Sequence, residues 1–205
     1  MAQRIIALFG GSFDPIHLGH TGVAEAAARR IGAQKTIFIP AKCSPLKSLS
    51  PHAGDEDRLR MVTLATANND SFAVSDRELK RPGPSFTLDT VRLLKKDLGG
   101  DTVIHWLLGA DSVNDLVHWY RVGELIDECN ITAMQRAGFP PPDFDRFESL
   151  WGPQRVTKLK QNVVQTPLID ISSTEVRRRL AAVEDVSGML HPDVIAYIWE
   201  HNLYR

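Results

Sequence analysis

Short apolar runs alternate with helical patterns along most of this 205-residue chain. Several of these runs are apolar at consecutive positions, which is typical of strands that are buried on both faces of a parallel sheet. We expect strands at Arg4–Phe9, Thr36–Ile39, Phe72–Ser75, Val103–Leu108 and Asn130–Gln135. We expect helices between them, over roughly Leu18–Ile31, Asp55–Asn68, Thr87–Leu98 and Val113–Glu128.

This alternation predicts an α/β fold, a Rossmann-like doubly wound parallel sheet. Ligands of such folds bind outside the carboxyl ends of the strands. At this length we expect a single domain over residues 1–205, with a small helical part from about residue 172 onward. The second half should hold a helix over Phe144–Leu159, a strand-like segment over Val163–Ile171, and short helices at Thr174–Ala182 and Pro192–His201.

The composition is that of an ordinary globular protein, with 43% hydrophobic and 24% charged residues. A net charge of −1 gives no reason to expect a nucleic acid or an anionic membrane as partner. No apolar run approaches the roughly 20 residues that cross a bilayer. The two cysteines, Cys43 and Cys129, lie far apart and suit a reducing compartment, so we expect a cytoplasmic protein. The sequence leaves the oligomeric state open, a homo-oligomer included.

The first expected strand runs directly into the block GGSFDPIHLGH, Gly10–His20, and a helix follows. Adjacent glycines allow the backbone to approach a ligand closely, and the start of a helix offers unpaired N–H groups to an anion. His17 and His20 share one helical face there, where imidazoles donate hydrogen bonds to phosphoryl oxygens and, when cationic, offset their charge. The block therefore predicts a triphosphate site that also includes Gly10, Gly11, Ser12, Phe13 and Gly19.

Simpler interpretations of this block exist. A Gly-Gly turn after a strand is common, and a histidine in a first helical turn often acts only as a cap. The two histidines could be half of a metal site, but the block has no glutamate as in HExxH and suggests no third ligand, so we expect no metal ion held by the protein. The block also differs from a P-loop, because no GK[ST] sequence occurs in it.

A second motif, ISSTEVR at Ile171–Arg177, lies toward the other end of the chain. Ser172 and Glu175 fit a capping box that opens a helix, which alone would explain them. A capped helix start followed one turn later by an arginine is also a phosphate cradle, because hydroxyls, N–H groups and a guanidinium can all hold oxygens. We expect Ile171, Ser172, Ser173 and Thr174 to contact a phosphate group, and Arg177 to bind its oxygens.

Together the two motifs resemble those of the nucleotidyltransferases, particularly the bacterial nicotinate-nucleotide adenylyltransferases. The first block is similar to their GG(T/S)FDPxHxGH signature and the second to their ISSTxxR motif. The HxGH element is shared with class I aminoacyl-tRNA synthetases and pantetheine-phosphate adenylyltransferase. On its own it therefore indicates the chemistry and leaves the substrate open.

Two further segments resemble the parts of this family that bind the acceptor. GPSFTLDT, which ends at Thr90, is similar to the family's GPSYTxDT segment, with Phe86 in place of the usual tyrosine. The resemblance implies that Ser85, Phe86 and Thr87 bind nicotinate mononucleotide. Trp119 stands where the family stacks a tryptophan on the pyridine ring, although an aromatic residue at such a position is more often part of a core.

Two single residues carry over from the same family. Asp111 belongs to a GAD motif after an expected strand, where a carboxylate can accept hydrogen bonds from the ribose hydroxyls of ATP. Lys47 matches the lysine of the family's PHK segment, with Leu46 in place of the histidine. The resemblance implies that Lys47 brings a mobile ammonium to the phosphates, whereas the simpler interpretation is a solvated loop lysine.

The resemblance implies transfer of AMP from ATP to nicotinate mononucleotide, which gives nicotinate adenine dinucleotide and pyrophosphate in NAD biosynthesis. An oxygen of the acceptor's own phosphate would attack, and its second pKa of about 6 makes a general base unnecessary at neutral pH. We expect His17, His20, Lys47 and Arg177 to stabilise charge, with Mg²⁺ carried on the ATP phosphates. Two alternatives stay open: an adenylyltransferase for nicotinamide mononucleotide or phosphopantetheine, and a nucleotide-binding module without turnover.

Overall fold

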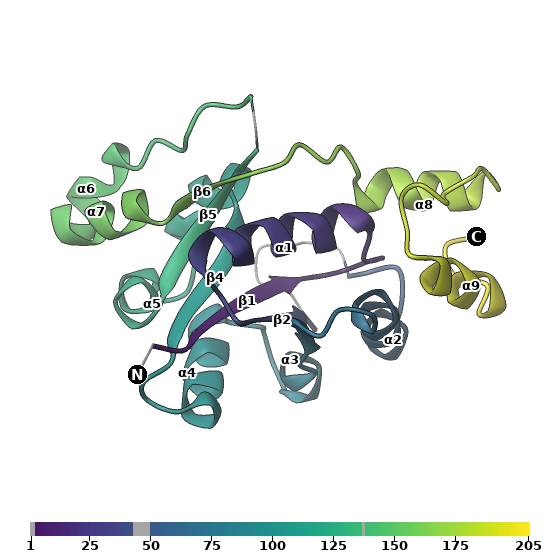
Figure 1. Ribbon diagram of the computed structural model, residues 1–205, viewed down its shortest axis with the longest axis horizontal. Helices are drawn as coiled ribbons and strands as arrows, with labels where there is room; N and C mark the ends of the chain where they lie inside the picture. Colours follow the sequence, from purple (N-terminus) through teal and green to yellow (C-terminus); the bar gives the residue numbers. More distant parts are fainter. Residues whose placement is uncertain (1–2, 43–49, 137) are drawn as a thin grey trace.

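A single parallel sheet organises the computed structural model, which describes residues 3–42, 50–136 and 138–205 (Figure 1). Its strands lie in the order β3-β2-β1-β4-β5-β6, all parallel to their neighbours. They are β1 (Ile5–Gly11), β2 (Lys35–Pro40), β3 (Phe72–Val74), β4 (Val103–Gly109), β5 (Asn130–Arg136) and β6 (Val163–Thr166). This is the Rossmann order, in which the direction of winding changes between β1 and β4. The expected α/β fold class is confirmed.

Burial on both faces explains why the strands read as continuous apolar runs. In β1, Ile6 and Leu8 contribute to one hydrophobic cluster, while Ala7 and Phe9 contribute to the other. Successive side chains of a strand point to opposite faces, so both sets must be apolar when helices cover both faces. The first cluster lies under α4 (Thr87–Leu98), η1 (Ala110–His118), α5 (Val122–Glu128) and α7 (Pro153–Gln161). The second lies under α1 (Leu18–Ile31), α2 (Asp55–Thr66), α8 (Ser173–Ala181) and α9 (Pro192–Glu200).

Three sequence-based expectations about elements are wrong. The helix expected over Val113–Glu128 is a 3-10 helix, η1, and a separate helix, α5, because Arg121 adopts a left-handed φ of 49° between them. The helix expected over Phe144–Leu159 is divided at Gly152, φ 79°, into η2 (Asp145–Phe147), α6 (Glu148–Trp151) and α7. The strand expected to reach Ile171 ends at Thr166, because the proline that follows has no N–H to donate to a neighbouring strand. One short helix, α3 (Arg77–Lys80), was not expected.

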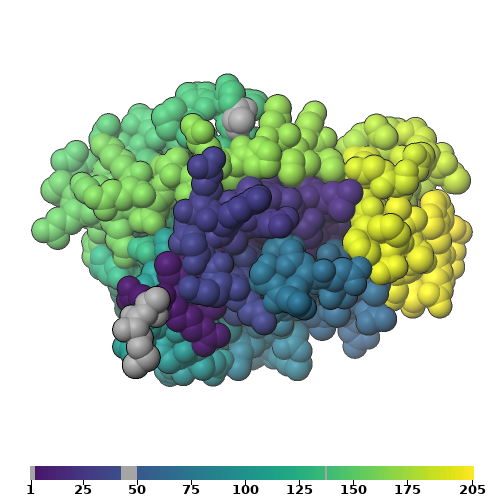
Figure 2. Space-filling model, viewed as in Figure 1, coloured from purple at the N-terminus to yellow at the C-terminus, as the bar shows by residue number. Residues whose placement is uncertain are grey.

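The C-terminal helices lie at the carboxyl end of β1. Figure 1 shows the β1 arrow pointing toward α8, and Figure 2 shows the C-terminal residues against the residues of α1 and α2. The backbone N–H of Leu18, at the start of α1, donates to the carbonyl of Met189, 2.8 Å away. Residues from both ends of the chain therefore meet where such folds bind ligands. No helix in the described part of the chain is long and apolar enough to cross a membrane.

Candidate active site

The site is built around the turn that follows β1. A methyl group on Gly10 would lie 2.5 Å from the Trp106 ring, so only glycine fits against this neighbouring strand. Phe13 adopts a left-handed φ of 47° and its ring is buried edge-on against Phe9, with ring centroids 5.7 Å apart. The carbonyl of Ser12 accepts a hydrogen bond of 2.6 Å from Arg58. Contacts with Trp106, Phe9 and Arg58 therefore fix the turn Gly10–Phe13, which lies at the carboxyl edge of the sheet.

His17 and His20 form a reciprocal cap at the start of α1, in which each side chain accepts a hydrogen bond from the backbone N–H of the other residue. His17 Nδ1 accepts from the His20 N–H at 3.3 Å, and His20 Nδ1 accepts from the His17 N–H at 3.2 Å. The two rings stack with centroids 3.6 Å apart. Gly19 permits this arrangement, because a methyl group there would lie 2.9 Å from His17 Nδ1. A capping box normally built from hydroxyl and carboxylate groups is here built from two imidazoles.

The reciprocal caps assign the tautomer of both rings. Because each Nδ1 accepts a backbone hydrogen bond, the proton of each neutral imidazole is on Nε2. Burial lowers the pKa of His17 to about 4, so this ring is neutral at pH 7. Without a bound nucleotide, His17 therefore offers a neutral N–H donor.

The second motif contacts the first directly. Ser172 caps α8, and its hydroxyl accepts from the Glu175 N–H at 3.2 Å, while the Glu175 carboxylate binds neighbouring arginines of its own helix. The Ser173 hydroxyl donates to the carbonyl of Pro15 at 3.0 Å. Ile171 packs beside Gly19, with its Cβ 3.5 Å from the position of a methyl group there. Two helix starts, which are far apart in the sequence, thus lie in direct contact.

Arg177 joins these two helix starts. Its Nη1 donates to the carbonyl of Asp14 at 2.6 Å, and its Nη2 donates to the Thr174 hydroxyl at 3.3 Å. The guanidinium also lies 3.7 Å from the Asp14 carboxylate. One turn into α8, Arg177 is therefore fixed against the segment that follows the Gly10–Phe13 turn, a position compatible with the cradle interpretation of the motif.

Asp14, which the sequence analysis did not single out, organises this region. Its side chain is only 8% exposed, and it accepts from the backbone N–H groups of His52 and Ala53 at 2.8 and 3.0 Å. It also accepts from His52 Nδ1 at 3.0 Å and from the Tyr204 hydroxyl at 2.9 Å. Burial alone would raise the pKa of Asp14, but these hydrogen bonds lower it below its ordinary value. The buried group is therefore a carboxylate anion at neutral pH.

Arg58 is the second residue that sequence reasoning missed. It is fully buried, with one donor on Ser12 and another on the Asp55 carboxylate at 2.6 Å. Within the described ranges its Nε has no hydrogen-bond partner. A guanidinium stays protonated when buried, so Arg58 places a permanent positive charge beneath the turn. The signal was available, because Arg58 shares the apolar face of α2 with Met61 and Val62, where a charged residue is unusual.

The segments expected to bind the acceptor also meet. Phe86 occupies the N-cap position of α4, and its ring stacks on the ring of Tyr120 with centroids 4.5 Å apart. Trp119, next to Tyr120, is half-buried against the first hydrophobic cluster. The GPSFT segment, with Ser85 and Thr87 on either side of Phe86, therefore lies beside the residues that link η1 to α5.

The chain directly after β2 connects the segment expected to bind the acceptor with the Gly10–Phe13 turn. The N–H of Ala41 donates to the carbonyl of Gly11 at 2.9 Å. The next N–H, of Lys42, donates to the Ser85 hydroxyl at 3.2 Å. Two consecutive backbone groups thus hold the two halves of the candidate site together.

One of the expected residues, Asp111, is not part of the contacts described above. Asp111 lies at the start of η1, just beyond the end of β4, with an exposed carboxylate 3.8 Å from Arg136. It is at the carboxyl edge of the strand next to β1, as expected for a ribose ligand. Lys47, and Leu46 beside it, lie outside the described residues.

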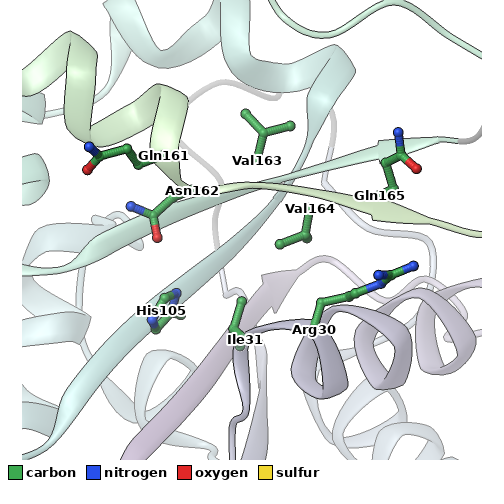
Figure 3. Close-up of a pocket in the computed structure, with 8 residues that line it drawn as sticks. All are labelled: Arg30, Ile31, His105, Gln161, Asn162, Val163, Val164 and Gln165. Carbon is green, nitrogen blue, oxygen red and sulfur yellow. The ribbon is translucent and has the colours of Figure 1, made fainter.

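A separate cavity of about 470 Å³ lies at the opposite edge of the sheet (Figure 3). It is lined by the last residues of α1, by His105 of β4 and by residues 161–165. It contains none of the expected site residues. Among the described residues there is also no group of three or more His, Cys, Asp or Glu that could hold a metal ion.

A Rossmann-like sheet with two facing, capped helix starts at its carboxyl edge defines an α/β nucleotidyltransferase. The family model described as cytidylyltransferase-like matches residues 8–179 of the chain. A curated Yersinia pestis protein named "Probable nicotinate-nucleotide adenylyltransferase" is 36% identical over 213 residues, covering 99% of this chain and 96% of the relative. A Dehalococcoides mccartyi protein of the same name is 38% identical over 211 residues, covering 100% and 99%. The chain belongs to this cytidylyltransferase-like family and, within it, to the nicotinate-nucleotide adenylyltransferases.

Solved structures show the same fold. Plasmodium falciparum nicotinic acid mononucleotide adenylyltransferase complexed with NaAD matches with a TM-score of 0.73 and 22% identity, covering 98% of this chain and 97% of that one. The same Plasmodium enzyme complexed with APC matches with a TM-score of 0.69 and 21% identity. At these identities the structures support the architecture and leave residue roles to be argued from the site itself.

Proposed function

We propose that this chain transfers the AMP portion of ATP to nicotinate mononucleotide, which forms nicotinate adenine dinucleotide and releases pyrophosphate. The observation that carries the proposal is the direct contact between the two motifs, from Arg177 to Asp14 and from Ser173 to Pro15. The proteins that share its family and nearly its whole length carry the corresponding name. The two motifs follow β1 and β6 of one sheet, which supports treating residues 1–205 as one domain.

The triphosphate would lie between the starts of α1 and α8. The Nε2–H groups of His17 and His20 would donate to phosphoryl oxygens, and the backbone of Gly10–Phe13 and Gly19 would allow close approach. Arg177 would bind the leaving pyrophosphate from the opposite side, with the start of α8, residues 171–174, contributing hydroxyls and N–H groups. Lys47 remains a proposed additional cation, and Asp111 a proposed acceptor for the ribose hydroxyls.

The acceptor would occupy the region beside Phe86 and Trp119. Ser85–Thr87 would bind its nicotinate carboxylate, and Trp119 would stack on its pyridine ring. The attacking phosphate oxygen is already largely deprotonated at neutral pH, since the second pKa of a phosphate monoester is about 6. The bond from this oxygen to the α-phosphorus forms as the bond to pyrophosphate breaks. Catalysis then depends on alignment and on stabilisation of the leaving group.

Mg²⁺ would enter this site bound to the phosphates of ATP rather than to protein side chains. The residues that face the turn are imidazoles, an arginine and backbone N–H groups, which bind phosphate oxygens rather than cations. Asp14 already accepts four hydrogen bonds. When bound to the phosphates, Mg²⁺ would neutralise part of their charge.

A cytoplasmic location, expected from the cysteine content, belongs to the same proposal.

A pyrophosphate-release assay with ATP tests the proposal against its rivals. The acceptors are nicotinate mononucleotide, nicotinamide mononucleotide and phosphopantetheine, each at equal concentration. We expect nicotinate mononucleotide to give the highest kcat/KM. A higher value for either other acceptor would overturn the substrate assignment. Binding of ATP without pyrophosphate release from any acceptor would favour a nucleotide-binding module.

A further inference from the structure

The segment after α9 returns to the candidate active site in an unusual conformation. Asn202 and Tyr204 both have left-handed backbone angles, with φ of 53° and 64°. A tyrosine rarely adopts this region, and it persists only where surrounding contacts determine it. The Leu203 N–H bonds to the Ile198 carbonyl at 3.0 Å, and the Tyr204 ring packs against the second hydrophobic cluster. These contacts aim the Tyr204 hydroxyl at Asp14.

The hydroxyl completes the set of donors around a buried anion. Asp14 Oδ2 accepts from the backbone and ring of His52, whereas Asp14 Oδ1 accepts from the Ala53 N–H and from Tyr204. Arg177 donates to the carbonyl of the same residue and lies 3.7 Å from its carboxylate. Tyr204 is thus one residue removed from the proposed pyrophosphate ligand and from the phosphate-binding turn.

We propose that Tyr204 is a positioning residue for adenylyl transfer: its hydroxyl fixes the Asp14 carboxylate, and Asp14 in turn fixes Arg177 and the turn before His17. The inference rests on the proposed function and goes beyond it by linking the last helix to the triphosphate site. Without the hydroxyl, Asp14 Oδ1 keeps one donor, and a buried carboxylate that lacks a donor moves to find another. The movement would carry Arg177 and the turn out of alignment.

A second tyrosine–aspartate contact provides a matched control for the possibility that Tyr204 only stabilises the fold. The Tyr197 hydroxyl, on α9, donates to the Asp57 carboxylate at 2.8 Å. This contact also ties the C-terminal part to the rest of the molecule through a tyrosine and an aspartate. Unlike the Tyr204 contact, it joins α9 to α2 and includes none of the expected site residues.

The test compares Tyr204→Phe with Tyr197→Phe in steady-state kinetics. For Tyr204→Phe we expect kcat/KM for ATP to fall about tenfold, the loss of one hydrogen bond to a charged group, while KM for nicotinate mononucleotide stays within about twofold. For Tyr197→Phe we expect all constants within about twofold of the wild-type values. Thermal midpoints of the two variants should agree within a few degrees. An unchanged kcat/KM for ATP in Tyr204→Phe, or an equal loss in Tyr197→Phe, would overturn the proposal.

Calorimetric titration with an α,β-methylene analogue of ATP separates this inference from the proposed function. The analogue binds without turnover, so the measurement does not depend on the acceptor. We expect Tyr204→Phe to bind it several-fold more weakly than Tyr197→Phe and the wild type. A wild type that fails to use nicotinate mononucleotide, yet shows this difference in analogue binding, would contradict the proposed function only. Equal binding by the two variants contradicts the role of Tyr204 whatever the acceptor.

Discussion

Hydrogen-bond direction at single residues decides what this site can do. In His17 and His20 the backbone occupies both Nδ1 atoms, so the rings present Nε2–H donors. His52 has the opposite arrangement, because its Nδ1 faces the Asp14 carboxylate, which can only accept. The sequence motif identifies which histidines belong to the site. It does not reveal their tautomers, because these depend on caps and on burial that only the folded chain defines.

His20→Ala removes one of the two proposed phosphate donors together with half of the reciprocal cap. We expect kcat to fall by about 100-fold, as for the loss of one donor to a developing charge, and stability to fall by about 1 kcal/mol from the lost cap. Turnover checks the first part, and urea denaturation followed by circular dichroism checks the second. Near-normal turnover in a folded variant would remove His20 from the proposed mechanism.

Trp119→Ala tests the proposed acceptor pocket. We expect KM for nicotinate mononucleotide to rise about tenfold or more, because stacking on an aromatic side chain contributes on the order of 1–3 kcal/mol per ring, while KM for ATP changes little. Trp151→Ala is the control, since Trp151 is also half-buried against the first hydrophobic cluster but stacks on Phe147. Equal changes in the two KM values would contradict the stacking role.

Helices and strands with a regular apolar pattern could be predicted from the sequence, whereas the points at which a helix is interrupted could not. The strands and α1 follow from consecutive apolar runs and from the Gly32 stop, whose φ is 69°. The break between η1 and α5 depends on a left-handed arginine, Arg121, which local sequence does not indicate. Gly152 did offer a signal for the division before α7, and the apolar spacing on both sides of it concealed that signal.

Gly19→Ala tests the element that joins the two motifs, the first turn of α1. Alanine is the better helix former by about 1 kcal/mol, so the substitution would be stabilising in an ordinary helix. Here the new methyl group lies 2.9 Å from His17 Nδ1, and we expect the reciprocal cap to open and kcat/KM for ATP to fall at least about tenfold. Gly100→Ala, where a methyl group meets nothing within 4 Å, should leave the kinetics unchanged. Wild-type kinetics in Gly19→Ala would show that the cap does not matter for catalysis.

For the whole molecule, the contacts that matter most lie beyond the reach of local patterns. The two motifs were recognisable separately, and their meeting through Arg177 and Asp14 depends on the segment that runs from the end of β6, at the edge of the sheet, back to the carboxyl end of β1 (Figure 1). The roles of Arg58 and Tyr204 depend on partners 46 and 190 residues away in the sequence. No periodicity identifies such pairs, because burial of a charged or phenolic group is a property of the assembled core.

Stability should decrease in mild acid because two histidines are buried in the neutral form. Burial lowers the pKa of His17 and of His105 to about 4, from an ordinary value of 6.5. Between these values the unfolded chain binds protons that the folded chain does not, so the free energy of unfolding falls as pH falls. We expect a loss of about 2 kcal/mol per histidine between pH 7 and pH 5, measured by urea denaturation.

His105→Asn isolates one of these contributions. Glu78 acts in the opposite direction, since burial raises the pKa of its carboxyl group, but it is present in both proteins. The variant should therefore lose about 2 kcal/mol less than the wild type over the same pH interval. An identical pH dependence of the two proteins would mean that His105 titrates normally in the folded state.

The meeting of Pro15 with Ser173 and of Asp14 with Arg177 also has a consequence for biosynthesis. A ribosome makes the glycine-histidine block before β2–β6, and its arginine partner only after these strands have been translated. A nascent or prematurely terminated chain can therefore contain the residues of β1 and α1 and still lack part of the proposed triphosphate site. Nucleotide binding would thus report that translation has passed α8, and ATP would stabilise chains that include α8 over shorter ones.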